Sequence, residues 1–139
     1  MKYLTDYIAE DQTKTFKKHG AFFAFSNKQF NDQRIEGVLY VDSGGGLICP
    51  KDKAEELDRE LLDIARHGIR EDLAENGKRG VIHRELGNHE YSYTHDITDT
   101  AAALSDYGIT EEEIKAEAGA YLKAFYEWEE AQSRQAVNQ

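Results

Sequence analysis

The densest group of residues with ligating or catalytic side chains lies in the stretch HRELGNHEYSYTHD, from His83 to Asp96. It holds three of the five histidines of the chain and three carboxylates within fourteen positions. Imidazole and carboxylate groups are the usual nitrogen and oxygen ligands of zinc and related metals. They are also the side chains that most often act as general acids and bases. The stretch is therefore the first place to test for a metal site or a catalytic centre.

The spacing of the three histidines does not match a helical metal pair. Such a pair needs two histidines four residues apart, with a glutamate beside the first. His83, His89 and His95 follow one another at intervals of six, so that neighbouring histidines on a helix would point about 120° apart. Tyr93 stands where an HExxH pattern would need its second histidine.

An ordinary helix explains the same stretch more simply. Ile82 and Leu86 fall on one side of a helix that would run from Arg79 to about His89. Glu85 and His89 are four residues apart, which is the spacing of exposed hydrogen-bonded pairs. We therefore interpret the stretch as a helix buried on one side, followed by an extended YSYTHD segment. A metal site and a catalytic cluster remain open alternatives.

Two further motifs have a chemical and a structural interpretation. Cys49, the single cysteine, excludes an internal disulfide framework and is typical of a reducing cytosol. It follows Ile48 at an apolar strand end with no helix N-terminus to activate its thiol, so we predict a buried structural residue rather than a nucleophile. The run Ser43–Gly46 lacks the Lys-Ser or Lys-Thr pair of a phosphate-binding loop, and we predict a turn instead.

The first half of the chain predicts a helix and short strands. Residues 3–19 have helical periodicity, and Gly20 can end that helix. The apolar run Ala21–Phe25 suits a buried strand, and Ser26 suits the N-cap of a short helix to about Gln33. Residues 38–41 and 47–49 predict a hairpin around the glycines.

The second half predicts helices. Residues 52–76 form a periodic pattern in which Gly68 suggests a bend, and Asn76-Gly77 ends it. Thr98 or Asp99 can cap a short helix that Gly108 ends. Thr110 and Glu113 form a capping-box pattern that opens a long final helix. The predicted core face of that helix is made of apolar residues at helical spacing: Ile114, Ala118, Tyr121, Leu122, Phe125 and Trp128.

The charge of the chain is strongly negative and uneven. It has 27 acidic and 17 basic residues among 139, a net charge of −10. Ten acids and three bases between Asp96 and Gln139 place −7 of that charge in the last 44 residues. This balance argues against broad direct binding of nucleic acid and favours either simple solubility or an acidic surface that meets a basic partner. No apolar run resembles a signal peptide or a membrane span, so we expect a cytoplasmic protein.

The segments GAFFAFSNKQF, GLICPK and HRELGNHEYSYTHDI resemble a group of small acidic proteins from phages and mobile elements of gut bacteria. Some members of that group are linked to the type II-A anti-CRISPR proteins, which inhibit Cas9. The resemblance implies a non-enzymatic inhibitor that places carboxylates where a nuclease would hold DNA phosphates. It brings no catalytic motif and transfers no binding residue.

We therefore predict one α+β domain over residues 1–139, mainly helical with a small antiparallel hairpin or sheet. The expected function is inhibition of a bacterial nuclease defence by binding, without a catalytic residue, metal or cofactor. The expected partner is a protein with a basic surface, a CRISPR effector nuclease in a bacterial cytoplasm. The predicted partner-binding residues are carboxylates of the final helix: Glu111, Glu112, Glu117, Glu127, Glu129 and Glu130. A metal-dependent enzyme centred on His83–Asp96 and a phage structural or regulatory protein are the alternatives. The sequence leaves the oligomeric state, the identity of the target and the step that is blocked open.

Overall fold

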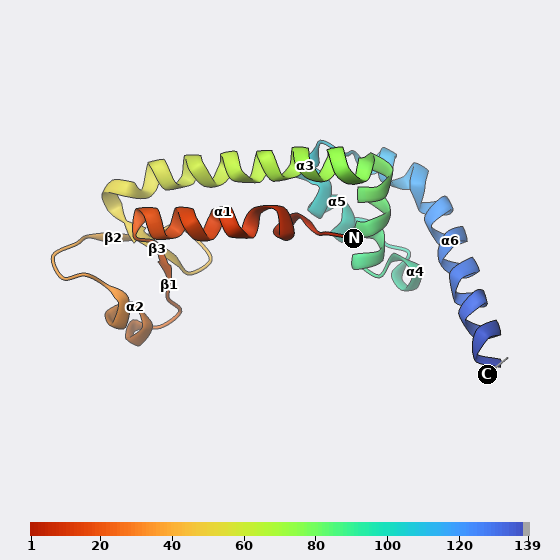
Figure 1. Ribbon diagram of the computed structural model, residues 1–139, viewed down its shortest axis with the longest axis horizontal. Helices are drawn as coiled ribbons and strands as arrows, with labels where there is room; N and C mark the ends of the chain where they lie inside the picture. The colour runs from red at the N-terminus through yellow and green to blue at the C-terminus, as the bar shows by residue number, and fades with distance from the viewer. Residues whose placement is uncertain (138–139) are drawn as a thin grey trace. The chain divides into compact units, whose positions relative to one another are not determined.

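The computed structural model describes residues 1–137 of the chain. The helices are α1 (Leu4–His19), α2 (Asn27–Gln33), α3 (Ala54–Asn88), α4 (Tyr91–Thr94), α5 (Thr98–Leu104) and α6 (Glu111–Val137), with single 3-10 turns at Lys51–Lys53 and Ser105–Tyr107. The strands are β1 (Phe22–Phe23), β2 (Tyr40–Asp42) and β3 (Leu47–Pro50) (Figure 1). The predicted α+β class, mainly helical with a small antiparallel sheet, is confirmed.

Contacts within the chain gather in two compact units. We call Lys2–Glu71 the N-terminal unit, and Met1 with the chain from Asp72 onward the C-terminal unit. Helix α3 contributes its first half to the former and its second half to the latter. Each unit is described by itself below.

In the N-terminal unit, α1 lies antiparallel to the first half of α3 (Figure 1). Gly20 ends α1 as predicted, in the left-handed region at φ 69°. The two helices approach closely at Gly68, where a Cβ atom would lie 2.3 Å from Cγ2 of Ile8. Gly68 therefore permits helix contact rather than a bend, and the break in α3 falls at Gly77, with φ 72° and ψ 159°.

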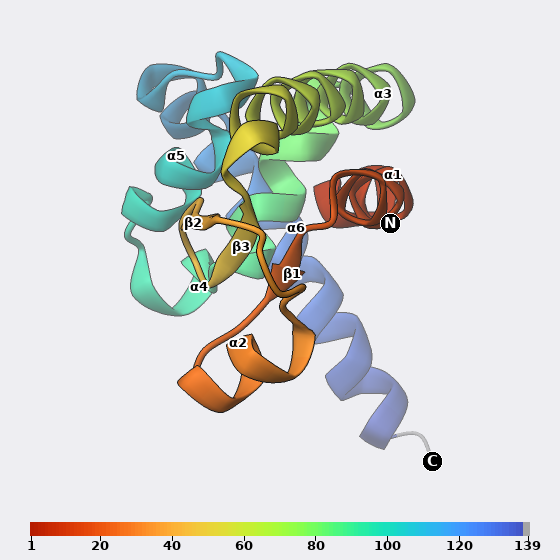
Figure 2. The same cartoon turned by 90° about the vertical axis from the view of Figure 1, so that its left-hand side faces the viewer.

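The three strands form one antiparallel sheet in the order β1-β3-β2 (Figure 2). The predicted hairpin is present, with Val41 paired to Cys49. Gly44, Gly45 and Gly46 between the strands all have positive φ, which explains why glycines are needed in this turn.

Strand β1 forms as predicted, but the apolar run Ala21–Phe25 that contains it is not wholly buried. Phe23 is 48% exposed and Phe25, after the strand, is 73% exposed. The reason is that β1 is a two-residue edge strand, paired only with β3. Leu47, Cys49 and Leu57 form the buried core of this unit, with Phe16 and Leu61 packed against it. Cys49 is fully buried, as predicted.

The core of the C-terminal unit joins the second half of α3 to α5 and α6. Its buried members are Val81, Ile82, Leu86, Leu104, Ile109 and Ile114. The capping box at the start of α6 is confirmed: Thr110 Oγ1 accepts from the Glu113 amide, and the Glu113 carboxylate accepts from the Thr110 amide, each at 3.2 Å. At α5 the carboxylate of Asp96 takes the role expected of Thr98 or Asp99, because its Oδ1 accepts from the Thr98 amide at 2.9 Å.

The prediction of an extended YSYTHD segment is wrong. Residues 91–94 form the short helix α4, and the residues on either side, Glu90 and His95, have φ values of 56° and 53°. Tyr91 packs against the core of the unit. A one-turn helix between two left-handed residues allows the chain to reverse while that ring stays in contact with the core.

Candidate partner-binding helix

Helix α6 begins inside the core and ends in solvent. Ile114 is fully buried and Ala118 is 7% exposed, whereas Trp128 at the other end of the predicted core face is 59% exposed. Every described residue from Tyr126 onward is exposed. The predicted core face is therefore core only over its first part, because α6 continues past the elements of its own unit that could cover it (Figure 1).

The continuation of this face is a row of aromatic rings, half-buried at Tyr121 and Phe125 and exposed at Trp128. Tyr121, Phe125 and Trp128 follow at helical spacing, with ring centroids 6.3 Å and 6.1 Å apart in succession. Tyr93 of α4 lies 6.3 Å from Phe125 and is 80% exposed. We call these four residues the aromatic stripe. Aromatic side chains that are grouped at a surface, with some of them fully exposed, are typical of interaction surfaces in soluble proteins.

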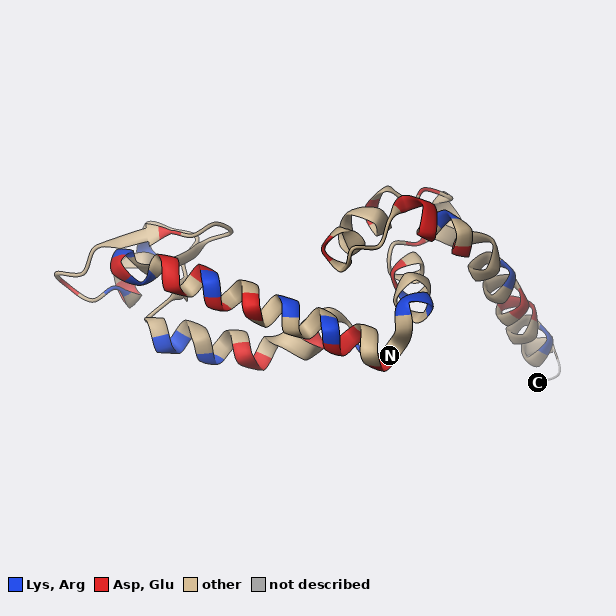
Figure 3. Cartoon of the chain, turned by 90° about the horizontal axis from the view of Figure 1, so that it is seen from above, with Lys and Arg blue, Asp and Glu red and all other residues tan. Residues whose placement is uncertain are grey.

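The carboxylates near the stripe lie mainly on the opposite side of α6. At about 100° per residue, Glu127 and Glu130 fall more than about 120° from the centre of the stripe, and Glu129 borders it. All three are exposed. The acidic residues of α6 fall into two groups, residues 111–117 near its start and 127–130 toward its end (Figure 3). The helix therefore offers an apolar face for contact and a charged face toward solvent.

The six predicted partner-binding carboxylates do not share one environment. Glu111 and Glu112 are exposed in the first turn of α6, one end of the helix away from Glu127, Glu129 and Glu130. Glu117 is engaged inside its own unit, where its Oε2 lies 2.8 Å from His83 Nε2 and 3.1 Å from Arg79 Nε. These two groups lower the pKa of Glu117, with the hydrogen bond from His83 as the largest cause. Glu112 and Glu130 have only long, exposed pairs, with Lys115 at 3.9 Å and Arg134 at 3.8 Å, whereas Glu117 is firmly engaged. Five of the six are therefore available to a protein partner.

The three histidines of the His83–Asp96 stretch contact three different groups. His83 pairs with Glu117 on α6, and His89 Nε2 lies 3.4 Å from Glu85 one turn before it. The predicted exposed hydrogen-bonded pair is wrong, because Glu85 is buried and His89 Nε2 makes no hydrogen bond within the described residues. The ring of His95 instead packs 5.7 Å from that of Tyr91. Side chains that contact separate partners do not form a shared coordination sphere. Within residues 1–137, the group with spacing suited to a metal ion lies elsewhere, in the N-terminal unit.

A buried polar network connects the second half of α3 to the segment before α6. The carboxylate of Asp72, fully buried, accepts hydrogen bonds from Arg84 at 2.8 Å, from Asn76 at 2.7 Å and from the hydroxyl of Tyr107 at 2.5 Å. Arg84 also donates from Nε to Glu85 at 3.0 Å. The network ties the two sides of the break at Gly77 to the segment before α6. Sequence patterns did not identify it, because an acid within a helical pattern looks like a solvated position.

The network fixes the charges of its members. Burial alone would raise the pKa of Asp72, but the hydrogen bonds from Arg84, Tyr107 and Asn76 outweigh it and the pKa is lowered. Burial and the hydrogen bond to Asp72 raise the pKa of Tyr107. Asp72 therefore stays ionised and Tyr107 stays neutral, which is the state in which the hydroxyl donates to the carboxylate.

Comparison with protein families gives one match, to a family of unknown function (DUF7659), over residues 4–127. The chain belongs to this family. The DUF7659 match covers most of both units and the first part of α6, and ends one residue before Trp128. Neither the curated proteins nor the solved structures contain a significant match to the chain. None of the described helices combines the length and apolar character that crossing a bilayer requires.

Proposed function

We propose that this DUF7659 protein is a non-enzymatic binding protein that inserts the aromatic stripe of α6 into a groove on a protein partner. The observation that carries the proposal is the exposure of Trp128 on the same helix face that buries Ile114 and Ala118. A single face that is core at one end and solvent-exposed at the other is a surface that a second protein can complete. Tryptophan and tyrosine are also the residues over-represented among those that dominate binding energies.

The spacing of the stripe supports a specific mode of contact. Tyr121, Phe125 and Trp128 stand at positions i, i+4 and i+7, the pattern by which an amphipathic helix lays its apolar face into a groove. Each aromatic side chain can bury about 150–250 Å². Tyr93 lies beside this row and widens it. The partner is therefore expected to present an apolar groove about two helical turns long.

The charge of the unit supports a basic partner. The C-terminal unit has fourteen acids and six bases, a net charge of −8. Such a field attracts a positively charged surface and raises the rate of encounter. Nucleic-acid-binding clefts are extended basic surfaces, and a partner of this kind agrees with the resemblance to inhibitors of CRISPR effector nucleases. We take Cas9 with its guide RNA as the first partner to test, in the bacterial cytoplasm where such a nuclease acts.

The test is direct binding followed by titrated inhibition. Full-length protein is presented to immobilised Cas9 with guide RNA, with and without target DNA, and DNA cleavage is then followed as the protein concentration rises. The proposal expects a saturable complex and inhibition that is complete near one equivalent, because a binder is consumed by its target. Inhibition by a small fraction of an equivalent would indicate an enzyme. If no complex forms, Cas9 is not the partner.

A further inference from the structure

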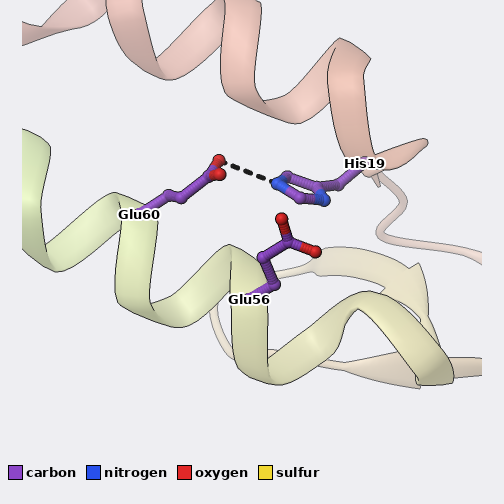
Figure 4. Close-up of side chains that lie close together, drawn as sticks. All are labelled: His19, Glu56 and Glu60. Atoms are coloured by element: carbon purple, nitrogen blue, oxygen red, sulfur yellow. Dashed lines mark hydrogen bonds and ion pairs between the residues drawn. The ribbon is translucent and has the colours of Figure 1, made fainter.

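A second group of chemically suited side chains lies in the N-terminal unit. His19, the last residue of α1, and Glu56 and Glu60 on successive turns of α3 bring one potential ligand atom each to within 4.8 Å of one another. Figure 4 shows the two carboxylates directed toward the imidazole ring. The histidine Nε2 lies 2.8 Å from Oε2 of Glu60.

The three residues are positioned by independent features of the fold. Glu56 and Glu60 are four residues apart, so they share one face of α3. The side chain of His19 is only 2% exposed, and Gly20 reverses the chain immediately after it. The imidazole is therefore held in place, whereas both carboxylates are partly exposed and can adjust. In the described part of the chain, no hydrogen bond or ion pair engages the carboxylate of Glu56.

The geometry points to a site for a divalent first-row transition metal, Zn²⁺ foremost, with His19, Glu56 and Glu60 as its protein ligands. Imidazole nitrogen and carboxylate oxygen are the donors that Zn²⁺ takes at about 2.0–2.2 Å. Ligand atoms around such an ion stand roughly 3.4 Å apart, so Glu60 must move about 0.6 Å from its hydrogen-bonded position. Three protein ligands leave a fourth position for water. This inference is independent of the binding function proposed for α6.

Lys18 is the group that opposes the site. Its ammonium lies 2.7 Å from Oε1 of Glu60, the oxygen that does not face the histidine. Lys18 and His19 together lower the pKa of Glu60, with the hydrogen bond from Lys18 as the largest cause. A metal ion would take the place of the proton on His19 Nε2. The Lys18 side chain, which is 61% exposed, can then turn toward solvent. The lysine is thus a competitor whose removal is expected to tighten metal binding.

The experiment measures Zn²⁺ binding to the full chain after removal of metal with a chelator. Isothermal titration calorimetry gives affinity and stoichiometry, and Co²⁺ in place of Zn²⁺ gives an absorption spectrum that reports the coordination. Glu56→Gln is the decisive variant, because it removes one ligand without breaking a bond that holds the fold. Glu71→Gln is its matched control, because it removes a carboxylate of α3 that lies beside a histidine, His67 at 2.8 Å, in a pair that has no third ligand among the described residues.

We expect one Zn²⁺ per chain in the wild type, and a loss of about tenfold or more in Glu56→Gln, since even outer-shell changes cost that much in metal sites. Glu71→Gln should bind like the wild type, and Lys18→Ala should bind more tightly. Absence of stoichiometric Zn²⁺ binding by the wild type would overturn the site. Equal loss in Glu56→Gln and Glu71→Gln would overturn it as well, because scattered surface binding would then explain the signal.

Discussion

The two units differ in how they use charge. The N-terminal unit has thirteen acids and eleven bases, a net charge of −2, and the polar residues that it buries are Thr15 and His19 rather than acids. The C-terminal unit has a net charge of −8, yet it buries an ionised pair, Asp72 and Arg84. Sequence charge alone would place the acids of the second unit at its surface. The comparison shows that two of these acids, Asp72 and Glu85, are buried in a structural network with Arg84. Only the exposed carboxylates are free for recognition.

The largest expected effect comes from removing the carboxylate of Asp72 from this buried network. Asp72→Ala leaves the Arg84 guanidinium buried without its main counter-charge, and we expect a loss of about 3–5 kcal/mol in the free energy of unfolding. Urea unfolding followed by circular dichroism measures it. Asp58→Ala, an exposed acid on α3, is the control and should change stability by no more than about 0.5 kcal/mol. Similar values for the two variants would mean that the network is not structural.

A smaller effect tests the helix contact of the N-terminal unit. In Gly68→Ala the new methyl group meets the branched Ile8 side chain at 2.3 Å. The overpacking cost of about 1–3 kcal/mol should exceed the gain in helix propensity, which is at most about 1 kcal/mol.

Gly119→Ala on α6 is the matched control for that change. A Cβ atom at Gly119 meets nothing within 4 Å, so this variant should raise the unfolding temperature while Gly68→Ala lowers it. Thermal unfolding of both variants measures the contrast. Stabilisation by both substitutions would show that α1 and α3 can separate at Gly68 without cost.

Charge reversal on α6 should change binding rate more than stability. Replacing Glu127, Glu129 and Glu130 with lysine should slow association with the basic partner several-fold at low salt, because surface charges act mainly on the rate of encounter. The difference should shrink as salt rises, since screening limits the field to about 8 Å at physiological ionic strength. Association rates against salt concentration measure this.

The control variant reverses three exposed acids of the N-terminal unit, Asp11, Asp58 and Asp63. It changes the net charge equally and separates a local field from the total charge. Equal slowing in the two triple variants would show that the position of the charge on α6 is unimportant. Circular dichroism checks that both remain folded.

The smallest effect concerns Glu117 and pH. His83 and Arg79 lower the pKa of Glu117 from its usual value of 4.5, so the ionised carboxylate stabilises the fold at neutral pH. That contribution is lost as pH falls below 4.5 through the lowered value. Glu117→Gln should therefore be less stable than the wild type at pH 7 and approach it at lower pH. Glu112→Gln, exposed and far weaker in its pairing, should show no such convergence.

Local features of the fold could be predicted from the sequence because neighbouring residues determine them. Gly20, the glycine turn after Asp42 and the Thr110–Glu113 capping box all behave as their local chemistry indicates. Cys49 was also predicted to be buried, because it lies in an apolar strand.

Features that depend on distant contacts could not be predicted in this way. The exposure of Trp128 depends on where the neighbouring helices end. The hydrophobic periodicity of α6 contains no information about those helices. Asp72 meets Tyr107 and His19 meets Glu60 only because helices bring together residues 35 and 41 positions apart. For the same reason, the densest histidine stretch was a poor guide to the metal-suited group.

The most direct test of the account compares two exposed aromatic residues of the same helix. Trp128 lies on the stripe, whereas Tyr126, 49% exposed, lies about 130° around α6 from its centre and contacts the stripe only through its ring, 5.7 Å from that of Phe125. We predict that Trp128→Ala weakens binding to Cas9 with guide RNA by about 30-fold or more, the loss of about 2 kcal/mol typical of a dominant interface residue. Tyr126→Ala should weaken it by less than about fivefold. Equal dissociation constants for the two variants, measured by biolayer interferometry, would contradict the claim that the stripe is the binding surface.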